Sequence, residues 1–147
     1  MFPSPILIID DSRTVLTIFG HLLRSRGHRV ITAKDGVEGV NAAASKVPRL
    51  ILCDITMPGL DGFEVVRRLG ASAVTREIPV VALTALTGAN ELKRIESAGF
   101  AGSISKTADP TQLALLIEAF LSSRAAQPTI GATQLTLARG SYARLKE

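Results

Sequence analysis

Three aspartates stand directly after short apolar runs, a placement that predicts an acidic ligand-binding pocket. Asp10 and Asp11 follow the apolar residues 6–9, and Asp54 follows the apolar residues 50–53. If both runs are buried parallel strands, their carboxyl ends open onto the crevice where open sheets bind ligands. Three carboxylates gathered there repel one another at low dielectric, so such a pocket requires a divalent metal, a lysine or both.

Lys106 is the candidate for the lysine, because it follows the short segment at residues 102–105. Each of these residues also has an alternative role. Asp10 and Asp11 could merely place negative charge at the start of a helix, where the helix dipole favours anions. Lys106 taken alone is an ordinary surface lysine. The pocket requires these three side chains to lie close to Asp54 in the fold, whereas the alternative roles do not.

Five apolar runs of strand length alternate with segments of helical period. The expected strands are residues 6–9, 29–33, 50–53, 78–83 and 103–105. Strands that alternate with helices form βα repeats, which build a parallel sheet covered by helices on both faces. Right-handed crossovers then leave few possible topologies. The sequence therefore predicts an α/β fold with one five-stranded parallel sheet.

Two of the intervening helices have clear apolar stripes and start signals. Apolar side chains recur at helical spacing over residues 15–23, after Ser12, which can cap the helix. A second stripe covers residues 113–121 and follows Asp109 and Pro110. Proline at the first helical position forgoes only an unpaired donor, so this pair predicts a helix start.

Size and composition limit the fold. The chain has 147 residues, enough for one domain with a full core and a short extension. Its 46% hydrophobic and 20% charged residues are typical of a globular protein. It has no apolar stretch of about 18 residues that could cross a bilayer, and we expect no cleavable leader before Ile6. A single cysteine excludes an internal disulfide framework, so a reducing, cytoplasmic location without membrane insertion is expected.

The net charge of +4 is concentrated at the C-terminal end. Four basic residues against one acidic residue give residues 124–147 a net charge of +3, which leaves +1 for residues 1–123. Residues 1–123 lack the dense basic stripe that a phosphate backbone requires, so we expect no DNA binding. Pro128 and Gly131 disfavour a regular helix beyond about Gln127. We expect a domain at 1–123 and a basic C-terminal extension or arm at 124–147.

Five segments of the chain, taken in order, resemble the receiver domain of two-component response regulators, the family of the chemotaxis regulator CheY. The matching segments are Ile9-Asp10-Asp11-Ser12, Cys53-Asp54-Ile55-Thr56-Met57-Pro58-Gly59-Leu60-Asp61-Gly62, Leu83-Thr84-Ala85, Ala98-Gly99-Phe100 and Ser105-Lys106. The resemblance covers about residues 5–123. It implies a flavodoxin-like, doubly wound sheet of strand order 2-1-3-4-5, with the site at the topological switch point as in that family.

The resemblance also implies roles for individual residues. Asp54 would be the phosphoacceptor. The implied ligands of Mg²⁺ are Asp10, Asp11, Asp54 and the backbone carbonyl of Thr56, in line with the preference of this ion for carboxylates and waters. Lys106 would contact a phosphoryl oxygen as a point charge, and the Thr84 hydroxyl would bond the new phosphoryl group. Thr84 could instead be an ordinary β-branched strand residue.

The function that the resemblance implies is that of a stand-alone response regulator. The donor would be a phosphohistidine on a sensor histidine kinase or a phosphotransfer protein. Phosphorylation would switch binding to a downstream protein partner, with slow autophosphorylation and autodephosphorylation in place of metabolic catalysis. A small Mg²⁺-dependent phosphatase is disfavoured, because Thr56 and not an acid stands two places after Asp54.

Two positions depart from the family pattern. Family members usually carry an aromatic residue three places before the lysine, where this chain has Ser103. They usually follow the lysine with proline, where this chain has Thr107. The resemblance therefore implies an intact phosphorylation site with an altered structural response to phosphorylation.

The C-terminal extension supports a second hypothesis. It contains Arg139, Tyr142 and Arg144, with Arg124 just before it, and guanidinium groups both stack on purines and bind phosphates. Some single-domain relatives of the chemotaxis regulator carry arginine-rich extensions that bind cyclic di-GMP and act at the flagellar motor, and this tail looks similar in composition. The alternative is a disordered, solubilising end, and both interpretations stay open.

The remaining cysteine and histidines are expected to be structural. Cys53 alternates away from Asp54 along a strand, which predicts a buried core thiol. His21 and His28 have no cysteine or histidine partner at metal-binding spacing.

Overall fold

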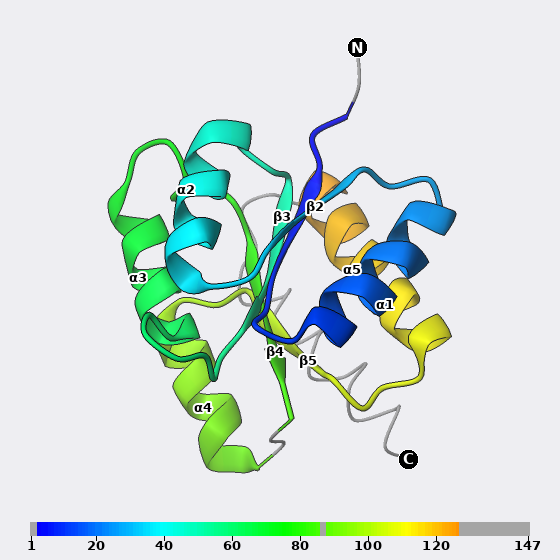
Figure 1. Ribbon diagram of the computed structural model, residues 1–147. Helices are drawn as coiled ribbons and strands as arrows, with labels where there is room; N and C mark the ends of the chain where they lie inside the picture. Colours follow the sequence, from blue (N-terminus) through cyan, green and yellow to red (C-terminus); the bar gives the residue numbers. More distant parts are fainter. Residues whose placement is uncertain (1–2, 86–87, 127–147) are drawn as a thin grey trace.

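The computed structural model describes residues 3–85 and 88–126 and contains one parallel sheet flanked by helices (Figure 1). The elements are β1 (Ile6–Ile9), α1 (Arg13–Ser25), β2 (Val30–Ala33), α2 (Gly36–Lys46), β3 (Leu50–Asp54), α3 (Gly62–Ala71), β4 (Val80–Thr84), α4 (Ala89–Ala98), β5 (Gly102–Ser105) and α5 (Pro110–Ala126). The strand order is β2-β1-β3-β4-β5. This confirms the expected α/β class and the implied strand order.

The central strands are apolar because both of their faces are covered. All four residues of β1 and the first four of β3 have no solvent-exposed surface. Pairing is parallel throughout, with Ile9 opposite Cys53 and Asp54 opposite Leu83. Parallel pairing in this register places the carboxyl ends of β1, β3, β4 and β5 along one edge of the sheet, where the acidic residues emerge.

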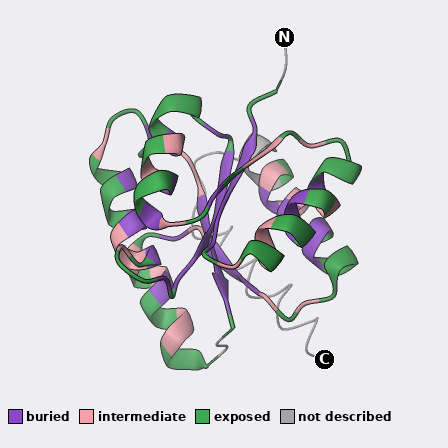
Figure 2. Cartoon of the chain, viewed as in Figure 1, coloured by how far each residue is buried: buried purple, intermediate pink, exposed green. Residues whose placement is uncertain are grey.

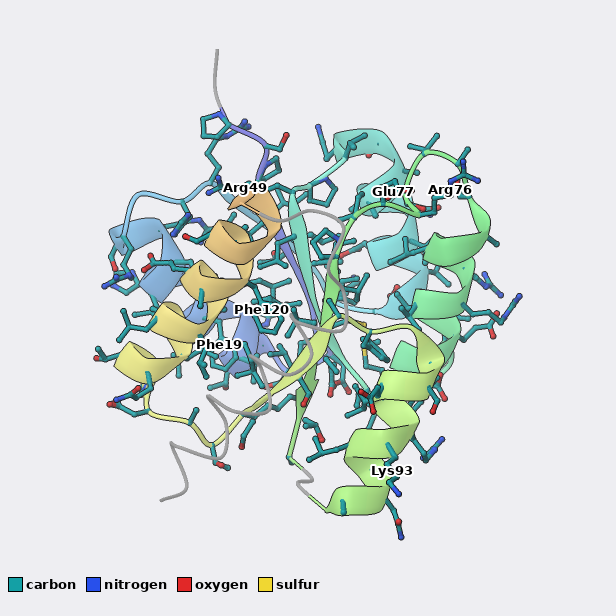
Figure 3. All side chains as sticks on the ribbon, turned by 180° about the vertical axis from the view of Figure 1, so that it is seen from behind. Phe19, Arg49, Arg76, Glu77, Lys93 and Phe120 are labelled. Carbon is teal, nitrogen blue, oxygen red and sulfur yellow. The ribbon has the colours of Figure 1, made fainter. Side chains whose placement is uncertain are left out.

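Two apolar cores lie on opposite faces of the sheet. Strand alternation sends Leu7 and Ile9 toward α2, α3 and α4, whereas Ile6 and Ile8 face α1 and α5. In Figure 2 the sheet is buried and the outer helix faces are exposed. Figure 3 shows Phe19 of α1 and Phe120 of α5 on the same side of the sheet, within the second of these cores.

Short polar side chains begin three of the helices. Ser12 accepts a hydrogen bond from Val15 N at 3.2 Å, as the sequence predicts. Asp35 and Asp61 cap α2 and α3 in the same way, each by accepting a backbone hydrogen bond three residues further along. Such caps satisfy donors that a helix start leaves unpaired. The Asp61 cap also fixes where the loop that follows Asp54 turns into α3.

The observed boundaries differ slightly from those predicted. β4 begins at Val80 instead of residue 78, after Pro79, which has no N–H to donate to the ladder. β3 and β4 each extend one residue further than expected, to Asp54 and Thr84. Helix α5 starts at Pro110 as predicted and runs to Ala126, across the expected boundary at residue 123. The expected arm beyond Gln127 lies outside the described residues.

An ionic network joins the middle of α5 to the residues that precede β2 and β3, at the edge of the sheet away from Asp10 and Asp54. Glu118 accepts hydrogen bonds from Arg26 at 2.7 and 2.8 Å and lies 2.9 Å from His28 Nε2. Arg49 donates to His28 Nδ1 at 2.8 Å, so the imidazole links α5 to the residue that precedes β3. This confirms a structural role for His28, whereas His21 is exposed on α1.

The structure also confirms the expected place of Cys53 in the core. Cys53 is fully buried, and burial raises the pKa of its thiol, as expected for a core residue and not for a nucleophile. No helix in residues 3–85 and 88–126 combines the length and the apolar character that a transmembrane span needs.

Candidate functional site

Adjacent strand ends bring the predicted site residues together. Asp10 directly follows β1, Asp54 ends β3, Thr84 ends β4 and Lys106 directly follows β5. Because β1, β3, β4 and β5 are neighbours in that order, residues far apart in the sequence meet at one edge of the sheet. This is the position at which open α/β sheets bind ligands.

Lys106 lies between two of the carboxylates. Its Nζ is 2.9 Å from Asp10 Oδ2 and 3.0 Å from Asp54 Oδ1. The Lys106 backbone N–H donates to the Thr84 carbonyl at 2.9 Å, which continues the β4–β5 pairing by one residue and holds the lysine at the site. Lys106 therefore contacts both Asp10 and Asp54 at the edge of the sheet.

The three carboxylates form one cluster. Asp10, Asp11 and Asp54 each offer an oxygen within 4.8 Å of the others. Asp10 is fully buried and Asp54 is 4% exposed, whereas Asp11 is exposed to solvent. The cluster therefore has a buried floor and a side that is open to water.

Burial and charge set the protonation of the site. Desolvation raises the pKa of Asp54 to about 6, an effect that Lys106 opposes and Asp10 reinforces. Burial lowers the pKa of Lys106, but hydrogen bonds to Asp10 and Asp54 outweigh it, so the pKa is raised overall. The lysine is therefore cationic at neutral pH. Asp54 is mainly ionised there, as a nucleophile must be.

The residues present fit a small divalent cation. One lysine faces three carboxylates, so the local charge is not balanced by Lys106 alone. Asp10 Oδ2 is buried, and its one close partner among the described residues is the Lys106 ammonium, which also contacts Asp54. A buried anionic oxygen of this kind gains from a further positive partner. Carboxylates with an open, wet side match the coordination that Mg²⁺ prefers.

The loop after β3 returns close to Asp54. The Thr56 backbone N–H donates to Asp54 Oδ1 at 3.4 Å, and the Gly62 N–H donates to the Ile55 carbonyl at 2.9 Å. Gly59 has φ 76°, a conformation that glycine adopts without strain. Thr56 therefore lies beside the carboxylate cluster, while its carbonyl as a metal ligand remains a prediction.

The sequence argument missed one local feature, a hydroxyl pair beside Lys106. Ser105 Oγ lies 2.7 Å from Thr107 Oγ1 and accepts a hydrogen bond from the Thr107 N–H at 3.1 Å. Serine with threonine two residues later, directly after a strand, is a signal for a side-chain-stabilised turn. This turn stands at the position after Lys106 where the resemblance described above implies a proline.

The predicted nucleotide-binding side chains lie outside the part of the chain that the structure describes. Arg139, Tyr142 and Arg144 lie outside the described residues, and so does the side chain of Arg124. Binding of cyclic di-GMP by the tail therefore stays a prediction. Thr84, by contrast, is described, buried and located at the site, as expected.

The metal-free protein is expected to lose stability as the pH rises through about 6. Because the folded pKa of Asp54 is raised above 3.8, this group contributes stability that is complete below that value and lost as Asp54 ionises near 6. Asp54→Asn removes this titration. In EDTA its Tm should exceed that of the wild type by roughly 2–4 °C at about pH 8, and less at about pH 5. An equal difference at both pH values would contradict the assignment.

Comparison with protein families gives one match that covers most of the chain. A family model described as the response regulator receiver domain matches residues 6–118. The match includes every residue of the carboxylate and lysine site and ends within α5, before the C-terminal extension.

Several curated proteins are similar in sequence. Protein PilH of Pseudomonas aeruginosa is 43% identical over 79 residues, which are 54% of this chain and 65% of PilH. Response regulator PleD of Caulobacter vibrioides is 36% identical over 108 residues, covering 74% of this chain and 24% of PleD. The polar-differentiation response regulator DivK of Brucella anthropi is 30% identical over 119 residues, covering 81% of this chain and 97% of DivK. The chain thus spans less than two thirds of PilH and about a quarter of PleD.

Solved structures show the same architecture. The chemotaxis protein CheY4 of Vibrio cholerae superposes with a TM-score of 0.76 at 26% identity, covering 80% of this chain and 98% of that chain.

Proposed function

Because the chain belongs to the response regulator receiver domains, we propose that it is a phosphoacceptor switch in which Asp54 takes up the phosphoryl group. The observation that carries the proposal is the position of Asp54. It is buried at a strand end, held 3.0 Å from the Lys106 ammonium, and joined to two further carboxylates within 4.8 Å. This arrangement provides a nucleophile together with positive charge for a phosphoryl group.

The transfer needs little chemistry beyond positioning. An Asp54 carboxylate oxygen attacks phosphorus in line, a new O–P bond forms and the bond to the leaving group breaks. The leaving group keeps the electron pair and takes a proton from solvent. Lys106 contacts a developing phosphoryl oxygen as a point charge. Mg²⁺ held by Asp10, Asp11, Asp54 and the Thr56 carbonyl would supply the additional charge neutralisation when bound.

The donor that fits this site is a phosphohistidine on a sensor histidine kinase or phosphotransfer protein. The N–P bond of phosphohistidine breaks readily, and a carboxylate with an exposed side can meet a protein surface. We further propose that the output is binding to a downstream protein. The PilH, PleD and DivK relatives support a signalling role, since two of them carry the words response regulator in their names.

Phosphorylation by a small-molecule donor tests the proposal. The protein is incubated with acetyl phosphate and Mg²⁺, or with acetyl phosphate and EDTA, and the intact mass is measured. We expect a gain of one phosphoryl group with Mg²⁺ and little or none with EDTA. No mass gain with Mg²⁺ across a range of pH would refute phosphoacceptor function.

The response to phosphorylation is expected to be weak at α4 and β5. Ser103 is buried and small, so this position has no ring to move between an outer and an inner site. Ser105 and Thr107 also hold the turn after Lys106 by hydrogen bonds. Beryllofluoride with Mg²⁺ should shift NMR amide signals near Asp54 and change those of residues 88–105 little. A large change across residues 88–105, absent in Asp54→Asn, would contradict this expectation.

A further inference from the structure

Gly36, in the first turn of α2, lies against the loop that follows the phosphoacceptor strand. A Cβ atom built on Gly36 would stand 2.6 Å from the Leu60 carbonyl oxygen, 2.8 Å from Leu60 Cβ and 3.0 Å from Val65 Cγ2. Contacts below 3.0 Å do not occur between real Cβ atoms and their neighbours, so something would have to move. One of the two closest atoms is backbone, which cannot rotate away as a side chain can.

The glycine is not explained by its own backbone conformation. Gly36 is absent from the glycines with positive φ, which are Gly27, Gly59 and Gly99 among the described residues. Glycine in a helix costs roughly 1 kcal/mol relative to alanine. The close approach of α2 to Leu60 is therefore what requires glycine at this position.

The two ends of the same loop lie close together. A Cβ on Gly62 would lie 2.5 Å from the Asp54 carbonyl oxygen and 2.7 Å from Ile55 Cα. The loop of residues 55–61 thus returns to the end of β3 at Gly62 and touches the first turn of α2 at Leu60, while Thr56 and Gly59 within it are exposed to solvent. Because Gly62 fixes the end of the loop against Asp54 and Ile55, a displacement at Leu60 is expected to change the path of residues 55–61, which include Thr56 beside Asp54.

We propose that Gly36 is a positioning residue for phosphorylation, through which the start of α2 sets the path of residues 55–61 around Asp54. The atoms nearest to the Gly36 Cβ position belong to Leu60 and Val65 and not to the carboxylate cluster, so Gly36 would act on Asp54 through the loop at Leu60. The inference rests on the proposed phosphoacceptor function, but its structural part does not depend on phosphorylation.

Gly36→Ala tests the proposal, with Gly70→Ala as the matched control. Gly70 is also helical, and a Cβ there meets no atom within 4 Å. In the unphosphorylated full chain we expect Gly36→Ala to shift the NMR amide signals of residues 55–61. Uptake of a phosphoryl group from acetyl phosphate and Mg²⁺ should slow roughly 10- to 100-fold. In an Mg²⁺ titration the same amides should respond at higher metal concentration, while Gly70→Ala matches the wild type in all three measurements.

Other results would overturn the proposal. Gly36→Ala could shift only the amide signals of α2 and be phosphorylated at the wild-type rate. In that case the helix adjusts to the added methyl group, and the path of residues 55–61 does not depend on Gly36. If Gly36→Ala does not fold, Leu60→Gly weakens the same contact from the loop side, and wild-type phosphorylation of that variant would also reject the proposal. If the wild type itself takes up no phosphoryl group, the proposed phosphoacceptor function is wrong. The amide shifts of residues 55–61 in Gly36→Ala would still show whether Gly36 positions the loop.

Discussion

Replacing Asp54 by asparagine is expected to abolish uptake of a phosphoryl group from acetyl phosphate. The amide oxygen is a far weaker nucleophile than a carboxylate, and the side chain keeps nearly the same size. Asp54 lies beside the Lys106 ammonium and retains some exposed surface, whereas Asp10 is fully buried and Asp11 is exposed without a lysine contact among the ion pairs of the described residues. The mass gain seen with wild type and Mg²⁺ should therefore disappear.

Asp109→Asn is the matched control for this change. Asp109 is exposed just before α5, and asparagine caps a helix as well as aspartate does. The control should be phosphorylated at the wild-type rate and melt at the same temperature. If Asp54→Asn still gained one phosphoryl group, and peptide mapping placed it on Asp10 or Asp11, the assignment of Asp54 as the acceptor would be wrong.

Replacing Lys106 by methionine is expected to slow phosphorylation roughly 100-fold, the usual cost of removing one group that stabilises charge in a transition state. Methionine keeps an unbranched, apolar stem and removes the ammonium that lies 2.9 Å from Asp10 and 3.0 Å from Asp54. Since Lys106 lowers the pKa of Asp54, the variant should also have an Asp54 pKa above about 6. Part of the lost rate should therefore return as the pH is raised.

Lys93→Met provides the control, because Lys93 is exposed on α4 and points away from the sheet in Figure 3. Its rate and pH profile should equal those of the wild type. The Asp54 side-chain carbon signal followed by NMR titration in EDTA gives the pKa directly. A Lys106→Met variant with an unchanged Asp54 pKa and an unchanged rate would show that the lysine does not act on Asp54.

Asp54 and Lys106 show how much of the site can be predicted from the sequence. The apolar runs predicted five strands, and the acidic and basic residues after them predicted the content of the site. These predictions hold because a buried strand must be apolar and because strand ends of a parallel sheet share one edge. Ser12 and Pro110 likewise predicted helix starts correctly, since capping depends on neighbours within one turn.

The strand order came from the resemblance to receiver domains, and the site depends on it. Asp10 and Lys106 are brought together only because β1, β3, β4 and β5 lie side by side in that order. Local periodicity carries no information about which strands are neighbours. The ends of the strands were predicted less accurately than their existence. β4, for example, begins at Val80, after Pro79, and not at residue 78.

By itself, the sequence determined which side chains are available for chemistry: three carboxylates, a lysine and a hydroxyl, each at the end of a strand. Only the tertiary structure decided their distances, the pKa of Asp54 near 6 and the buried Asp10 oxygen that favours a metal. It also decided the contact of Gly36 with Leu60 and the link from His28 to Glu118. Gly36 and Leu60 are 24 positions apart in the sequence, and His28 and Glu118 are 90 positions apart. Tertiary packing brings such residues together, and no local sequence pattern encodes it.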